Sequence, residues 1–174
     1  MFYGRNNTMR NISAIVYTSG TGFTRRYAQM LSRAAALPAY DLENTGSLPE
    51  DGVKILYLGW LRAGGIVGLS KVRRRWRVQA VCAVGMAPEY PQEKLAAQNH
   101  TGELPVFFLQ GGYAPERMRG INKLMMGLMT KQMTKNPPKD EAEAEIQKLF
   151  LQGGDFVSEA NLAPVLSWLR ENRA

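Results

Sequence analysis

A run of hydroxyl-bearing and glycine residues directly follows the first apolar segment of the chain. The run consists of Ser19, Gly20, Thr21, Gly22, Phe23 and Thr24. A helix is expected immediately after it, and the first turn of a helix offers unpaired N–H groups and partial positive charge that suit a phosphate. Glycines let the backbone curl around a ligand without a Cβ in the way, and the hydroxyl groups add donors. The residue types therefore predict a phosphate-binding loop.

The same six residues also have a purely structural interpretation. Serine and threonine are favoured at helix N-caps and in turns, so the run could serve only to begin a helix. The run lacks the lysine of the nucleoside-triphosphate loop, and it lacks the GxGxxG spacing of the dinucleotide fingerprint. Taken alone, it leaves the binding and the capping interpretations open.

The elements that would position this loop alternate between strand and helix. Hydrophobic periodicity predicts strands at 13–18, 39–42, 53–60, 79–86 and 104–110, and helices at 24–36, 67–74, 92–98, 115–134, 140–151 and 158–172. This alternation predicts an α/β fold, a doubly wound five-stranded parallel sheet in the order 2-1-3-4-5 with helices on both faces. We expect a single domain over 1–174, with 1–11 as a candidate disordered tail.

Three loops should meet where the strand order of such a sheet reverses, because ligands bind there beyond the carboxyl ends of the strands. They follow the first, third and fourth strands, and each contains glycine. The second and third of these loops supply further candidate contacts to a cofactor: Trp60, Leu61, Arg62, Ala63, Gly64, Gly65, Gly85, Met86 and Ala87.

The run from Ser19 to Thr24 resembles the FMN-phosphate loop of the flavodoxin-like family, usually S/T-x-T-G-x-T. The resemblance implies FMN as the cofactor, with its phosphate in the first loop and its flavin ring beside the other two. Gly20 and Phe23 depart from the usual hydroxyl and polar residues. Trp60 either stacks on the flavin or ends its strand and packs under the next helix. Backbone amides of 61–65 could bind the ring.

A basic, methionine-rich segment follows the last expected strand. Its helix could lie on an anionic membrane, bind a partner, or simply pack on the sheet with methionine as filler. The segment is similar to the flavodoxin-domain subfamily that includes menaquinone-dependent protoporphyrinogen dehydrogenase. That similarity implies a quinone acceptor, membrane-surface association, and a dicarboxylate substrate facing Arg117, Arg119 and Lys123.

The composition limits the classes of binding partner and the cellular location that we expect. The net charge of +7 favours acidic partners, and Arg62 would raise the flavin potential by stabilising reduced, anionic flavin. The basic run 71–77 is interpreted as a solvated helix face, because no nucleic-acid-binding pattern accompanies it. Cys82 is the only cysteine and His100 the only histidine in the sequence, so we expect no metal site. The lack of a membrane span or signal-peptide core predicts a cytoplasmic protein, peripheral at the inner face if it meets the membrane.

Three hypotheses about function follow. The first is an FMN-binding redox protein that carries electrons between a reductant and a protein or small-molecule acceptor. The second is an FMN-dependent oxidoreductase of the protoporphyrinogen dehydrogenase type, which uses a quinone at the membrane surface. The third is a binding module that kept the fold and lost FMN. No catalytic residue is nominated, because FMN itself would carry the chemistry.

Overall fold

A mostly parallel sheet forms the centre of the computed structural model, which describes residues 12–172. Its long strands are β1 (Ala14–Tyr17), β2 (Ala39–Asp41), β3 (Lys54–Arg62), β5 (Arg77–Gly85) and β6 (Val106–Gln110), paired in parallel in the order β2-β1-β3-β5-β6. The expectation of an α/β protein with a parallel central sheet is confirmed. The expectation of a disordered tail concerns residues outside the described part.

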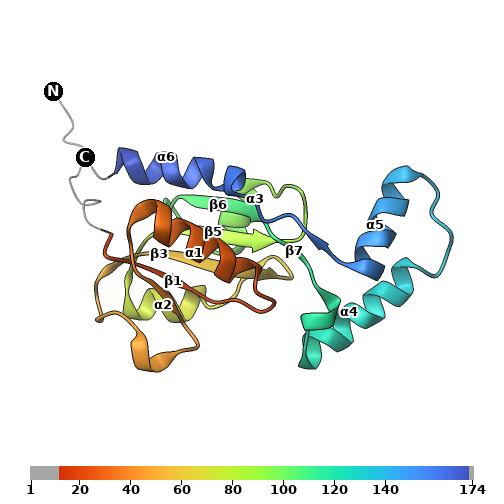
Figure 1. Ribbon diagram of the computed structural model, residues 1–174, viewed down its shortest axis with the longest axis horizontal. Helices are drawn as coiled ribbons and strands as arrows, with labels where there is room; N and C mark the ends of the chain where they lie inside the picture. Colours follow the sequence, from red (N-terminus) through yellow and green to blue (C-terminus); the bar gives the residue numbers. More distant parts are fainter. Residues whose placement is uncertain (1–11, 173–174) are drawn as a thin grey trace.

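Helices pack on both faces of this sheet (Figure 1). On one face, α1 (Phe23–Ala35) and α6 (Ala163–Glu171) share a core with β1 and β3. On the other face, α2 (Leu69–Arg75) and α3 (Gln92–Gln98) share a second core. Strand β3 is buried without interruption from Ile55 to Gly59, as a central parallel strand covered on both faces requires.

The third strand ends later than the sequence predicts. It was expected over 53–60, followed by a loop, but β3 runs to Arg62 and β4 (Gly65–Ile66) returns antiparallel to it. The two residues between them, Ala63 and Gly64, have φ values of 49° and 81°. Positive φ at both central residues is the geometry of a two-residue hairpin turn, which alanine rarely signals in a sequence. The expected loop is therefore a tight hairpin.

Two predicted helices begin later than expected. In place of a helix over 115–134, the structure has a 3₁₀ turn, η2 (Pro115–Arg117), then α4 (Gly120–Met133). Gly120 has a φ of 58°, a break that a continuous helix would not contain. In place of a helix over 158–172, it has η3 (Glu159–Leu162) and then α6, where a proline without an N–H stands in the first turn.

Helices α4 and α5 (Glu141–Gln152) form a hairpin that projects from the sheet, to the right in Figure 1. Its neck consists of β7 (Gly112–Tyr113) and β8 (Gly154–Asp155), which pair antiparallel. Asp140 begins α5 as its N-cap and accepts a hydrogen bond from the Glu143 N–H (2.8 Å). Tyr113 packs against Phe150, with ring centroids 5.8 Å apart. The hairpin is therefore an insertion between β6 and α6.

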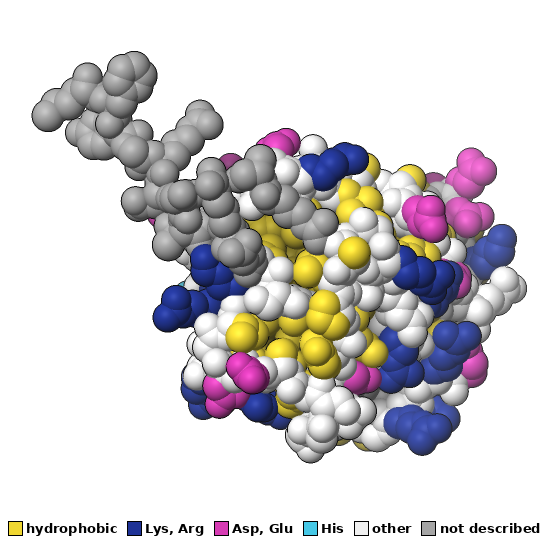
Figure 2. All heavy atoms as spheres, turned by 60° about the vertical axis from the view of Figure 1, so that its left-hand side comes forward, with side chains coloured by type: hydrophobic (Ala, Val, Ile, Leu, Met, Phe, Trp, Pro, Cys, Tyr) yellow, Lys and Arg dark blue, Asp and Glu magenta, His cyan; other side chains and the backbone are white. Residues whose placement is uncertain are grey.

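The surface away from the hairpin mixes apolar and basic side chains. Figure 2, which brings that side forward, shows hydrophobic side chains toward the middle of the face and Lys and Arg side chains mostly toward its edges. Within residues 12–172, no helix combines the length and hydrophobicity needed to cross a membrane.

Candidate functional site

The loop after β1 is held in a compact turn by Ser19. Its Oγ accepts hydrogen bonds from the N–H groups of Gly22 (3.1 Å) and Arg25 (3.3 Å). Gly22, at φ 101°, begins α1 as its N-cap. The next two N–H groups, of Phe23 and Thr24, lie in the first turn of the helix and have no acceptor within the described chain. Two amide donors therefore remain for a ligand.

Two side chains of the loop point inward. Phe23 is buried, and a Cβ placed on Gly112 would lie 2.9 Å from the Phe23 Cζ atom. The ring therefore packs on the glycine pair that follows β6. Thr24 is 1% exposed, and its contact with a ligand stays a prediction. Thr21 is half-buried and remains the accessible threonine of the loop.

Trp60 lies against the loop after β1. A Cβ placed on Gly20 would lie 3.4 Å from the Trp60 indole, an ordinary van der Waals contact. The guanidinium carbon of Arg62 lies 6.0 Å from the centroid of the same ring. The loop after β1 therefore contacts the end of β3 at this indole, and its stacking on a flavin stays a prediction.

The ends of the neighbouring strands β3 and β5 also lie in contact. A Cβ placed on Gly85 would lie 3.1 Å from the Leu61 Cδ1 atom. The tip of the β3–β4 hairpin is fixed to α3, because the Asn99 side chain donates to the Gly64 carbonyl (2.9 Å) and accepts from the Ile66 N–H (2.7 Å). Met86 is half-buried, whereas Ala63, Gly65 and Ala87 are exposed. Packing thus joins the loop after β1 to the end of β3, and the end of β3 to the end of β5.

Arg117 adds a cation that the sequence does not place at this loop. Its Nη1 atom donates to the Thr21 carbonyl (3.3 Å), and its Nε atom lies 3.4 Å from a Glu116 carboxylate oxygen. The nominated partners Arg119 and Lys123 are exposed at the start of α4. Arg117 and Thr21 are 96 residues apart, so spacing along the chain gave no signal of the contact.

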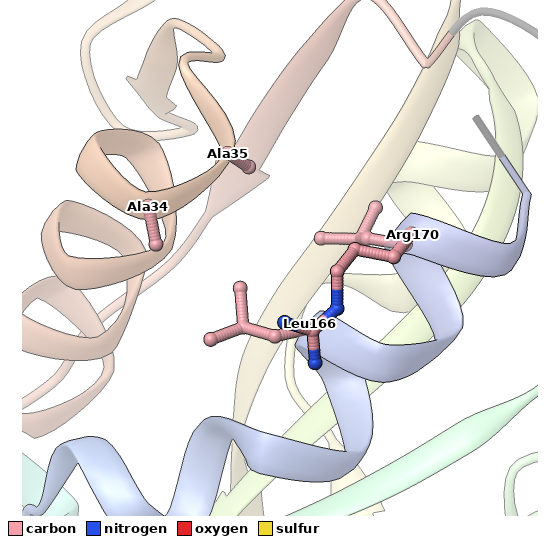
Figure 3. Close-up of a pocket in the computed structure, with 5 residues that line it drawn as sticks. Ala34, Ala35, Leu166 and Arg170 are labelled. Atoms are coloured by element: carbon pink, nitrogen blue, oxygen red, sulfur yellow. The ribbon is translucent and has the colours of Figure 1, made fainter. Parts of the chain in front are cut away.

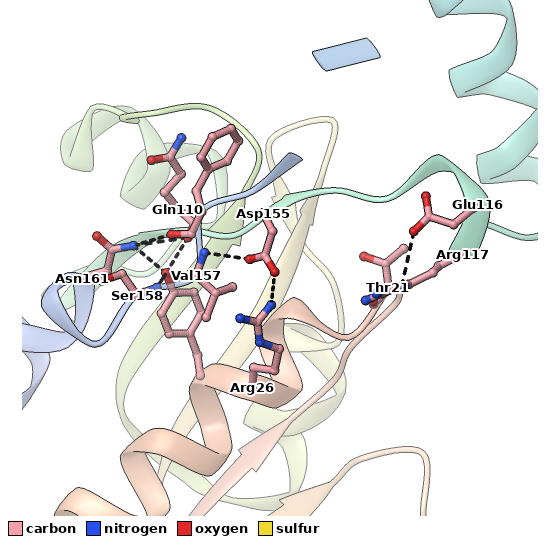
Figure 4. A network of polar contacts seen from close by, with 11 residues as sticks. Thr21, Arg26, Gln110, Glu116, Arg117, Asp155, Val157, Ser158 and Asn161 are labelled. Carbon is pink, nitrogen blue, oxygen red and sulfur yellow. Dashed lines mark hydrogen bonds and ion pairs between the residues drawn. The ribbon is translucent and has the colours of Figure 1, made fainter. Parts of the chain in front are cut away.

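A polar network fixes the start of α1 to the neck of the hairpin (Figure 4). Arg26 pairs with Asp155 of β8, which also accepts from the Val157 N–H (3.1 Å). Partial burial acts to raise the pKa of Asp155, but the hydrogen bonds from Arg26 and Val157 and the charges of Arg26 and Arg117 outweigh it and hold that pKa below its usual range. Asp155 is therefore ionised at neutral pH.

Two further polar contacts set the orientation of α1. The Tyr27 hydroxyl donates to the Gln110 carbonyl at the end of β6 and accepts from the Asn161 side chain (2.6 Å). The Arg25 side chain pairs with Asp41 of β2 (3.0 Å). That hydrogen bond to Asp41 raises the pKa of the Arg25 guanidinium above its ordinary value. The helix that carries the loop is thus tied to both edges of the sheet.

One pocket of the described surface lies elsewhere. It sits between α1 and α6 (Figure 3) and is lined by Ala34, Ala35, Leu166, Leu169 and Arg170. These residues lie at the far end of α1, roughly 20 Å along the helix axis from the loop. A second pocket, between α1 and the first two strands, also contains none of the nominated site residues. No group of residues within 12–172 has the composition of a metal site.

Comparisons with known proteins give no description of function for this chain. No protein-family model matches the chain, and no curated protein matches it. The chain is similar to a solved structure described as "Crystal structure of an hypothetical protein", with 14% identity, coverage of 93% of this chain and 79% of that chain, and a TM-score of 0.34.

Proposed function

We propose that this chain is an FMN-binding redox protein with a flavodoxin-like fold. The observation that carries the proposal is the contact of the loop after β1 with the last residues of β3, where Gly20 lies against Trp60, beside the end of β5, where Gly85 lies against Leu61. The strand order β2-β1-β3-β5-β6 reverses between β1 and β3, and ligands bind at such a reversal in doubly wound sheets.

The loop after β1 fits the phosphate of FMN. It offers the two amide donors of the first helical turn, the Thr21 hydroxyl and the Arg117 guanidinium, which together match a doubly charged oxyanion. When bound, FMN supplies the transfer of one or two electrons. The residues of the chain bind and tune it, and Arg62 and Arg117 would favour the reduced, anionic flavin.

An absorption spectrum of the purified protein, followed by titration of the apoprotein with FMN, tests this proposal. We expect flavin absorption bands, or quenching of FMN fluorescence on addition of apoprotein. Colourless protein that fails to bind FMN at about ten micromolar or more would contradict it.

Three observations favour a second candidate, a module that has lost FMN. The Ser19 hydroxyl is engaged by two amides of its own loop, Thr24 is buried, and two pockets of the described chain lie away from the nominated residues. This candidate predicts the colourless outcome of the same experiment.

For the electron acceptor, we propose an acidic protein surface or a quinone. Arg119 and Lys123 are exposed and continue the positive charge of Arg117 away from the loop. Replacing both by Glu should slow electron transfer to an acidic acceptor and leave FMN affinity unchanged. If the rate of electron transfer at low ionic strength is unchanged, Arg119 and Lys123 do not contact the acceptor.

A further inference from the structure

Two contacts, each made by an arginine, join the base of the α4–α5 hairpin to the loop after β1 and to the helix that follows this loop (Figure 4). After β7, the Nη1 atom of Arg117 donates to the Thr21 carbonyl (3.3 Å). In β8, Asp155 pairs with Arg26 in the first turn of α1. The hairpin is therefore attached to the candidate phosphate site through both of its ends.

The two helices of the hairpin pack mainly on each other. Both are described in full by the structure, and α4 has no buried residue while α5 has only Phe150. Phe150 packs on Tyr113, which belongs to the neck rather than to the central sheet. Gln147 of α5 donates to the Met133 and Asn136 carbonyls (3.0 and 2.9 Å), which joins α5 to the end of α4. The orientation of the hairpin therefore depends on the contacts at its neck.

The Arg117 guanidinium lies where an anion in the loop would reach it. Glu116 holds its Nε atom (3.4 Å), while its Nη1 atom contacts the loop. A Cβ placed on Gly22, the N-cap of α1, would lie 3.7 Å from that Nη1 atom, so the guanidinium is beside a helix N-terminus, where oxyanions bind. Arginine can bind a phosphate through two parallel hydrogen bonds between opposite charges, a stronger contact than one bond to a neutral carbonyl. A bound phosphate would therefore strengthen the attachment of the hairpin.

We propose that a phosphate-bearing ligand in the loop after β1 fixes the orientation of the α4–α5 hairpin through Arg117. The proposal rests on the proposed function, because FMN is the expected ligand, and it adds that the phosphate controls a distant element. Besides the apolar contact of Phe23 with Gly112, the free protein holds the hairpin by an exposed hydrogen bond and an exposed ion pair, and such contacts contribute little. The hairpin therefore samples several orientations until the phosphate bridges α1 and η2.

The coupling works in both directions. The factor by which the phosphate favours the fixed orientation equals the factor by which that orientation raises the affinity for the phosphate. Arg119 and Lys123, the exposed side chains proposed to face the electron acceptor, lie at the start of α4. Cofactor binding therefore places this acceptor surface, and the protein without cofactor presents it in no fixed position.

Distances between two spin labels, measured by pulsed electron paramagnetic resonance on the full chain, test the proposal. Cys82 is buried, so the labels attach to cysteines introduced at two exposed positions, Lys135→Cys after α4 and Ser70→Cys on α2. We expect a broad distance distribution in the apoprotein and loss of its broad component with saturating FMN. Saturating inorganic phosphate, compared with chloride at equal ionic strength, should have the same effect, because the coupling needs only the oxyanion.

Arg117→Gln should abolish the narrowing at FMN concentrations that saturate the variant, whereas the matched control Arg119→Gln should retain it. The Arg117 side chain is 57% exposed, so its loss should leave the fold intact, which circular dichroism checks.

The outcomes separate this proposal from the redox function. A narrow distribution in the apoprotein, a distribution that bound FMN leaves unchanged, or narrowing that persists in Arg117→Gln would overturn the coupling and leave the redox function standing. Narrowing by inorganic phosphate in a protein that does not bind FMN would support the coupling and contradict the redox function. A protein that binds neither ligand would contradict both.

Discussion

At the scale of single residues, Arg117 defines the charge of the candidate site. Its guanidinium reaches the loop after β1 from a distant part of the chain, whereas the neighbouring Arg119 begins α4 and is exposed. The side chains of the loop itself contribute less than their types indicate, since Thr24 is buried and Ser19 holds the turn. Affinity for a phosphate should therefore depend on Arg117 and the amides of the helical turn.

Replacement of Arg117 by Gln should weaken FMN binding about tenfold, because a hydrogen bond to a charged group contributes roughly 1.5–3 kcal/mol and solvent exposure reduces that value. Arg119→Gln is the matched control and should bind FMN like the wild type. Fluorescence titration of the two apoproteins measures the difference. Equal affinities would exclude Arg117 from the phosphate site.

The Arg26–Asp155 pair should make stability depend on pH. The folded pKa of Asp155 is lowered, so its contribution is present above the unfolded value of 3.8 and is lost as the pH falls through the folded value. Asp155→Asn should lower the free energy of unfolding at pH 7 by no more than about 1 kcal/mol, since both side chains are substantially exposed. Urea unfolding should show the wild-type advantage shrinking toward about pH 3. A difference that is constant over this range would mean that Asp155 acts other than through its charge.

At the scale of elements, the neck determines whether the hairpin can form. Strands β7 and β8 approach closely, and a Cβ on Gly112 would lie 2.2 Å from the Gly154 carbonyl oxygen. A Cβ on Gly153 would likewise lie 2.5 Å from the Tyr113 carbonyl oxygen, and Gly153 has a φ of 77°. The glycines at 111–112 and 153–154 are therefore explained by packing of the neck and of Phe23.

Alanine at two glycines should have opposite effects on stability. Gly112→Ala forces a methyl group against backbone and should destabilise the fold by about 2 kcal/mol or more. Gly127→Ala, in the middle of α4 with nothing within 4 Å of the added Cβ, should stabilise that helix by up to about 1 kcal/mol. Thermal unfolding followed by circular dichroism compares the two. A neutral Gly112→Ala would show that the two strands of the neck are not in close contact.

At the scale of the whole molecule, the sequence predicted the features that depend on local pattern. Alternating apolar segments predicted the α/β class, and the glycine-containing loop after β1 does contact the end of β3 at Trp60. The turn at Ala63 was missed because alanine carries no signal for positive φ. The Arg117 contact was missed because it joins residues far apart in the chain. The periodicity of α4 predicted an apolar face, but periodicity alone does not say whether a sheet covers it, and here the helix projects outward instead (Figure 1).

The most direct test of the account compares FMN with riboflavin, which lacks the phosphate, in calorimetric titrations of the apoprotein. If the loop after β1 holds the phosphate, FMN should bind at least about thirtyfold more tightly than riboflavin, because charged hydrogen bonds worth roughly 2 kcal/mol or more are made only with FMN. Equal affinities would place the phosphate outside the loop, and absence of FMN binding would contradict the redox function.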